Sequence, residues 1–207
     1  LLREQTLDFA RKQTQALTLA VSEQTARTLQ TVEQALHAVE PILSHAPRLD
    51  IAGLANPTHA LPYLKAIWWL DTSDQIAFDS NPAEQALHAS AFGPTHPQWA
   101  SVRMAPAHTV HWLASQRPSA DGVWYLIAAH PVYDAGNNYR GMLMAAMDPK
   151  PISALWRNID LGSDSSITLL HRNGDGMLRE PHLESAIGKN YRHRPLFKDY
   201  LVEQSEG

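Results

Sequence analysis

The stretch GVWYLIAAHPVYDAGNNYRGMLMAAM, residues 122–147, predicts a β-hairpin. Its two apolar segments, 122–133 and 139–147, are rich in residues that favour strands. The polar segment between them, DAGNN, is typical of a tight hairpin turn. Strand patterns also occur over 64–70, 76–80 and 108–115, and the polar segment DTSDQ separates the first two. The sequence therefore predicts five strands, of which the last three form an antiparallel run.

The N-terminal part of the chain predicts a long helix, because residues 1–40 contain neither Gly nor Pro. A helix of about 40 residues would be about 60 Å long. Its second half carries an apolar stripe at helical spacing, made of Leu29, Val32, Leu36, Val39 and Leu43. We expect this helix either to pair with a second copy or to lie along its own domain.

Shorter helices are predicted over 83–92 and over 149–159, the second with prolines in its first turn. After it, SSITLLHRNGDGMLREP (165–181) repeats the hairpin pattern of the first strand pair. The fold class is therefore α+β, with helical and irregular segments that cross between the second and third strands.

Composition excludes several classes of function. The net charge is -4, which gives no basic surface for nucleic acid. There is no cysteine, and therefore no disulfide or thiolate site. No nucleophile motif, zinc-protease motif or phosphate-binding glycine loop is present, so we expect no catalytic residues and no enzyme activity in this chain.

Eleven histidines are present, but their spacing does not predict a metal site. His108 and His111, three residues apart on a predicted strand, would face opposite sides of the sheet. We therefore expect neither a metal nor a cofactor, and we interpret the histidines as mostly exposed.

Several segments resemble double Cache (PDC) sensor domains, which are PAS-like and occur in bacterial membrane-anchored diguanylate cyclases and histidine kinases. The resemblance lies in YLKAIWWLDTSDQIAFDSNP, in the hairpin that begins at Gly122 and continues through DLGSDSSITLLHRNGDG, and in IGKNYRHRPLF. It implies an N-terminal helix that forms a homodimer, a membrane-distal PAS-like module and a membrane-proximal one. We assign them to residues 1–45, 46–160 and 161–207, and expect the last to be incomplete. The resemblance also implies a periplasmic location between two transmembrane segments.

Candidate ligand-binding residues follow from the predicted sheet and its cover. Trp99 and Arg103 would supply an aromatic wall and a cation for a ligand carboxylate. Along the fourth strand, Trp124 and His130 would share one face while Tyr125 lies on the other. Asp148 matches, by resemblance, the position that holds an amino-acid ammonium group, although it could instead cap the following helix.

We therefore expect a ligand-sensing module, whose ligand is a small organic anion or an amino-acid-like molecule, with a GGDEF diguanylate cyclase as the output. The alternatives are the sensor domain of a histidine kinase or chemoreceptor, and a dimerisation module that binds no ligand.

Overall fold

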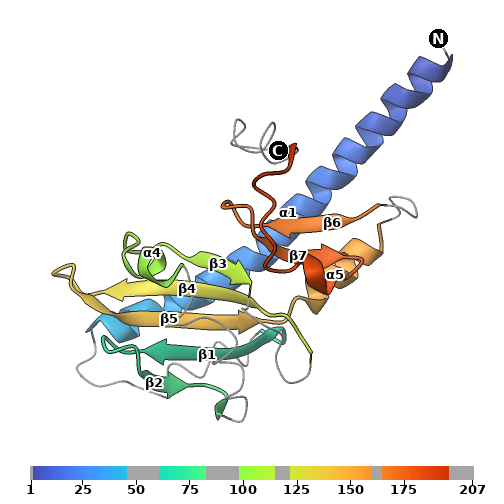
Figure 1. The fold of residues 1–207 in the computed structure, drawn as a ribbon. Helices are drawn as coiled ribbons and strands as arrows, with labels where there is room; N and C mark the ends of the chain where they lie inside the picture. Colours follow the sequence, from blue (N-terminus) through green and yellow to red (C-terminus); the bar gives the residue numbers. More distant parts are fainter. Residues whose placement is uncertain (1, 46–60, 83–97, 115–121, 160–164, 196–207) are drawn as a thin grey trace.

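The computed structural model describes residues 2–45, 61–82, 98–114, 122–159 and 165–195. Its helices and strands, in chain order (Figure 1), are α1 (Leu2–His45), β1 (Leu64–Leu70), β2 (Ile76–Asp79), α4 (Trp99–Arg103), β3 (His111–Ala114), β4 (Leu126–Tyr133), β5 (Tyr139–Met147), α5 (Lys150–Arg157), β6 (Ile167–Leu170), β7 (Gly176–Glu180) and the short 3-10 turn η2 (Glu184–Ala186).

The central feature is a five-stranded antiparallel sheet with the order β2-β1-β5-β4-β3. The hairpin β4–β5 lies in its middle, with His130 opposite Leu143. The turn is closed by Asp134, whose Oδ1 accepts hydrogen bonds from the backbone N–H groups of Gly136 and Asn138, both at 2.9 Å. The predicted α+β fold, a long N-terminal helix followed by an antiparallel sheet, is confirmed.

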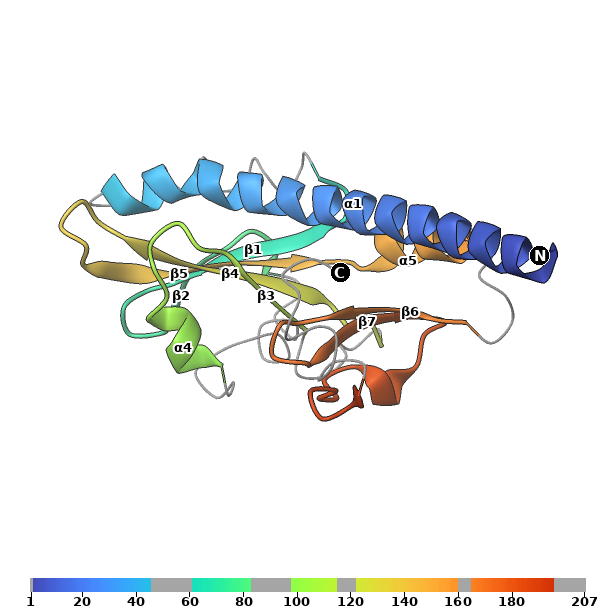
Figure 2. The ribbon, with the colours of Figure 1, turned by 90° about the horizontal axis from the view of Figure 1, so that it is seen from above.

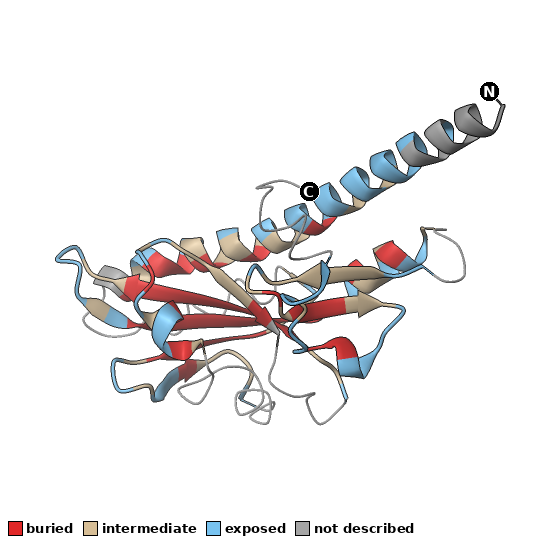
Figure 3. Ribbon diagram, turned by 45° about the horizontal axis from the view of Figure 1, so that its top comes forward, coloured by how far each residue is buried: buried red, intermediate tan, exposed pale blue. Residues whose placement is uncertain are grey.

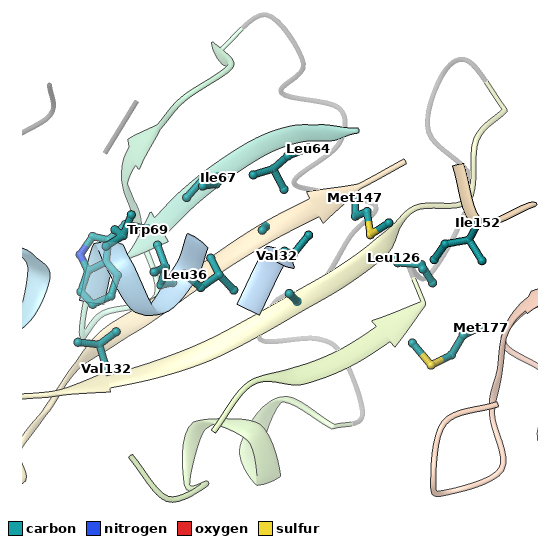
Figure 4. Packing of buried hydrophobic residues seen from close by; sticks show 14 of the residues in the cluster. Val32, Leu36, Leu64, Ile67, Trp69, Leu126, Val132, Met147, Ile152 and Met177 are labelled. Carbon is teal, nitrogen blue, oxygen red and sulfur yellow. The ribbon is translucent and has the colours of Figure 1, made fainter. Parts of the chain in front are cut away.

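α1 lies along one face of this sheet, and α4 lies on the other face (Figure 2). The predicted apolar stripe is the contact surface: Val32 and Leu36 are fully buried and point toward the strands (Figure 4). The side chains that they meet come from every central strand and include Ile67, Trp69, Leu126, Val132 and Leu143. Thus the second half of the helix lies along its own domain.

The first half of α1 extends beyond the sheet and is largely exposed from Lys12 to Ala20 (Figure 3). Phe9 is 70% exposed and Leu19 is 62% exposed. Among the described residues no helix is both long and apolar enough to cross a membrane.

α5 joins the sheet to a second, two-stranded sheet formed by β6 and β7. Met177 and Leu178 of β7 are buried in the same apolar cluster as Trp156 of α5 and Leu126 of β4. The second hairpin is therefore packed against the core of the first sheet.

The first strand and the fifth strand have the predicted bounds, whereas β3 and β4 are shorter than predicted. β4 begins at Leu126, after Gly122 with a φ of 77°. β3 begins at His111, because His108 has a left-handed φ of 64° that no strand accommodates. The prediction that His108 and His111 lie on one strand is therefore wrong: only His111 belongs to β3. The helix predicted over 83–92 lies outside the described residues.

Candidate functional site

Two of the three predicted aromatic residues, Trp99 and Tyr125, lie on the face of the sheet beneath α4. Trp99 of α4 is 6% exposed, and Tyr125, just before β4, is 2% exposed. Both belong to a second apolar cluster that includes Trp68, Leu113, Ile127, Met142 and Met144. Residues 83–97, part of the predicted cover of this face, lie outside the described residues.

Arg103 lies at the end of α4 and binds the turn between β1 and β2. Its Nη1 donates to Oδ2 of Asp74 at 3.1 Å, and its Nη2 donates to the carbonyl of Thr72 at 3.1 Å. The guanidinium also lies 4.8 Å from the ring centroid of Tyr139, within the range of a cation–π contact. In this arrangement the predicted cationic anchor is already paired with a carboxylate.

Two polar atoms around Arg103 are buried without a hydrogen-bond partner among the described residues: Oδ1 of Asp74 and the hydroxyl of Tyr139. Burial raises the pKa of Tyr139 to about 12, against the lowering effect of the Arg103 charge. Such unpaired groups are costly to bury. They mark the Arg103 end of the sheet as a place where a polar ligand could be held.

A cavity of about 530 Å³ lies beside the same turn. It is bounded by the C-terminal end of α1, the β1–β2 turn and the β4–β5 hairpin, and its lining includes Leu43, Trp69, Asp71, Thr72, Tyr139 and Arg140. This volume is within the range of small-molecule sites.

His130 lies on the opposite face, fully buried beneath α1. Its Nδ1 lies 3.1 Å from the carbonyl oxygen of Thr109, which can only accept a hydrogen bond, so Nδ1 carries the proton. Its Nε2 lies 3.1 Å from Oε2 of Glu40 on α1. The direction of this approach is not that of a hydrogen bond, and Nε2 has no hydrogen-bond partner among the described residues.

Two further imidazoles surround the same carboxylate. Nδ1 of His37, one turn earlier on α1, lies 3.4 Å from Oε2 of Glu40. Nδ1 of His108 lies 3.0 Å from both carboxylate oxygens. The rings of His37 and His130 meet edge to face, with their centroids 5.0 Å apart. We name His37, Glu40, His108 and His130 the Glu40 cluster.

Burial alone would raise the pKa of Glu40, and it is the largest influence. The hydrogen bond from His108, the charge and close approach of His130, and the hydrogen bond from His37 together outweigh it, so the pKa of Glu40 lies below its ordinary value. The buried carboxylate is therefore ionised at neutral pH.

The last two predicted site residues lie apart from both groups. Trp124 is half-buried and directly precedes Tyr125. Asp148 is buried at the end of β5, where its Oδ1 accepts the backbone N–H of Lys150 at 2.9 Å, at the start of α5. Its Oδ2 lies 3.9 Å from Nζ of Lys65. Asp148 therefore bonds the first residue of α5 from just outside the helix, whose N-cap residue is Pro149.

The six predicted residues are thus distributed over both faces and both ends of the sheet, with only Trp99 and Tyr125 in one cluster. Sequence reasoning missed Glu40 and His37 altogether. The one available signal was their spacing of three residues on a predicted helix, beside the apolar stripe.

Comparisons with known proteins agree with this fold. Residues 151–207 match the model of a dCache_1-like family described as a histidine kinase sensor domain. The sequence has no match among curated proteins.

Solved structures align over most of the chain. The extracellular domain of rpHK1S-Z16, named as a histidine kinase, is 20% identical with a TM-score of 0.74, over 96% of this chain and 82% of that one. The sensor domain of the V. cholerae histidine kinase DctB is 13% identical with a TM-score of 0.57, over 85% and 68% of the two chains. The ligand-binding domain of the Pseudomonas aeruginosa chemoreceptor PctC, in complex with GABA, is 16% identical with a TM-score of 0.53, over 84% and 76%. The chain therefore has the PAS-like Cache fold of extracellular sensor domains, and its C-terminal quarter carries the dCache_1-like sensor signature.

Proposed function

We propose that this chain is the extracytoplasmic ligand-sensing domain of a membrane-anchored signal-transduction protein, and that it is not itself an enzyme. The observation that carries the proposal is the structural likeness to a histidine kinase extracellular domain over 96% of the chain. The match of residues 151–207 to a sensor-domain family supports it independently of the fold.

The ligand is a small organic anion or an amino-acid-like molecule. Similar structures were solved with GABA and with L-isoleucine. The binding region is the Arg103 end of the sheet, where the unpaired polar atoms of Asp74 and Tyr139 lie beside a guanidinium. A ligand carboxylate would take the place of Asp74 on Arg103, and a ligand ammonium group would bind the released Asp74.

The signal passes through α1, because this helix is packed on the sheet and extends beyond it (Figure 2). A ligand that binds one arrangement of sheet and helix more tightly shifts the population toward that arrangement. The exposed first half of α1, with Phe9 and Leu19, would form the homodimer contact. Through this contact the change in arrangement would reach the rest of the parent protein.

The output domain lies outside this chain. The sequence resemblance suggested a GGDEF diguanylate cyclase, whereas the family match favours a histidine kinase. Autophosphorylation and cyclic di-GMP synthesis, both assayed in the full-length parent protein, distinguish the two.

A thermal-shift screen of the purified chain against amino acids, amines and organic acids tests the ligand proposal. A ligand at 100 times its Kd adds about 2.7 kcal/mol of stability, which raises Tm by about 5–10 °C in a domain of this size. We expect Arg103→Gln to abolish that shift, while Arg172→Gln, an exposed arginine in the β6–β7 turn, retains it.

A cooperative melt that no compound shifts would contradict ligand sensing and favour the ligand-free dimerisation module. A shift that survives in Arg103→Gln would place the ligand elsewhere on the domain.

A further inference from the structure

The Glu40 cluster brings together side chains that are far apart in the sequence. His37 and Glu40 come from α1, His108 from the segment before β3, and His130 from β4. The ligand-type atoms of His37, Glu40 and His130 all lie within 4.8 Å of one another. Glu40 is 7% exposed and His130 is fully buried, whereas the side chains of His37 and His108 are 39% and 74% exposed, so the cluster is open to solvent on one side.

One buried atom at the centre of the cluster, Nε2 of His130, has no hydrogen-bond partner among the described residues. Nδ1 of His130 donates to the carbonyl of Thr109, while Nε2 lies 3.1 Å from Oε2 of Glu40 outside hydrogen-bond geometry. A metal ion held beside Nε2 and Oε2 would give Nε2 the partner that it lacks in the described part of the chain. The hydrogen bond from Nδ1 of His130 to the carbonyl of Thr109 is of the kind that orients metal-binding imidazoles in other proteins.

Two of the three ligand–ligand distances match a shared metal ion, and the third is within 4.8 Å. Zinc binds imidazole nitrogen at about 2.0–2.1 Å and carboxylate oxygen at about 2.0–2.2 Å, so two ligands at a tetrahedral angle lie about 3.3 Å apart. Oε2 of Glu40 lies 3.1 Å from Nε2 of His130 and 3.4 Å from Nδ1 of His37. Two imidazoles and one carboxylate form a ligand set that suits zinc and neighbouring divalent transition metals.

We propose that His37, Glu40 and His130 bind one divalent transition-metal ion, with His108 available as the fourth ligand. The ion would connect α1 to β4 directly, because two ligands belong to the helix and one to the sheet. Metal binding would therefore hold the helix against the sheet. This inference does not depend on the proposed organic ligand, whose region lies at the Arg103 end of the sheet.

Titration of the metal-free chain with ZnCl2, followed by calorimetry and by thermal melting, tests the site. We expect one Zn2+ per chain and a rise in Tm that MgCl2 does not produce. Replacement of Zn2+ by Co2+ should give the intense visible absorption of a tetrahedral cobalt centre. Hydrogen exchange should slow in residues 36–43, because the ion ties this part of α1 to the sheet.

Two variants and two controls make the test specific. His37 has a side chain that is 39% exposed, so His37→Gln should fold; Glu40→Gln keeps the shape of the buried side chain. Each should weaken zinc binding at least tenfold, since removal of outer-sphere partners alone costs 10–100-fold. His182→Gln and His193→Gln, both exposed and outside the cluster, should bind zinc as the wild type does.

Absence of saturable zinc binding would overturn the proposal, as would equal binding by wild type and His37→Gln. Loss of binding in His182→Gln or His193→Gln, with no loss in His37→Gln, would assign the zinc to surface histidines and overturn it too.

Discussion

The indole N–H of Trp156 donates a hydrogen bond of 3.0 Å to the hydroxyl of Thr25, and both residues are buried. This bond connects α5, which leads to the second hairpin, to the middle of α1. A second indole makes a similar link, since Nε1 of Trp112 on β3 donates to Oε1 of Glu33 at 2.7 Å. The long helix is therefore fastened to α5 and to β3 of the five-stranded sheet by directional polar contacts, as well as by its apolar stripe.

Thr25→Val removes the acceptor of the Trp156 indole and keeps the shape of the side chain. The N–H group would remain buried without a partner, so we expect the free energy of unfolding to fall by about 1–3 kcal/mol. Urea denaturation measures this change.

Thr18→Val is the matched control, because Thr18 is exposed and its hydroxyl bonds only to the carbonyl of Thr14 within the helix. We expect a change within about 0.5 kcal/mol there. Equal stability of Thr25→Val and Thr18→Val would show that the bond to Trp156 contributes nothing.

The central hairpin and the long helix were predictable because their signals are local. Apolar, strand-favouring segments on both sides of DAGNN predicted β4 and β5, and the absence of Gly and Pro predicted α1. The choice of face was not predictable, because β4 is buried on both sides: Leu126 and Ala128 pack beneath α1, whereas Ile127 and Ala129 pack on the α4 side. When a strand is apolar on both faces, its sequence does not indicate which face is covered by α1 and which by α4.

The candidate sites were less predictable for a different reason. Glu40, His108 and His130 meet only because the helix crosses the sheet at one position, and no spacing in the sequence encodes that crossing. Arg103 was expected to anchor a ligand carboxylate, and its pairing with Asp74 was not predictable because it depends on the β1–β2 turn.

The exposed first half of α1 should control dimerisation if the homodimer proposal holds. Phe9→Glu combined with Leu19→Glu places charges on two large, exposed apolar side chains of this segment. We expect the dimer Kd to rise at least tenfold in sedimentation velocity experiments, with the Tm of the domain little changed.

Thr18→Glu, at an exposed polar position of the same segment, should leave the dimer Kd unchanged. A wild-type chain that stays monomeric at high concentration, or a dimer that tolerates both charges, would remove the first half of α1 from the interface.

The stability of the domain should fall as the pH decreases below about 6.5, partly because of His111. Burial, then the charges of His171 and His130, lower the pKa of His111. The folded state therefore binds fewer protons than the unfolded state in this range, and acid favours unfolding. His111→Gln should make the decline in the free energy of unfolding between pH 7 and pH 5 less steep.

His193→Gln, at an exposed position, should leave that slope unchanged. Urea denaturation at several pH values measures both slopes. Should the wild type and His111→Gln decline in parallel, His111 has no part in the pH dependence.

Gly141 is the position where a single methyl group should be most damaging. It lies on β5 with a φ of 148°, and a Cβ atom there would collide with the carbonyl oxygen of Leu70 and the ring of Trp69. Overpacking typically costs about 1–3 kcal/mol, and a left-handed backbone adds about 1–2 kcal/mol for a residue with a side chain. We expect Gly141→Ala to lower the free energy of unfolding by about 3 kcal/mol.

Gly122→Ala separates the steric collision from the backbone strain, because Gly122 also has a positive φ, 77°, but no atom within 4 Å of an added Cβ. It should cost only about 1 kcal/mol, and similar losses in the two variants would mean that the strand β1 moves aside to accept the methyl group.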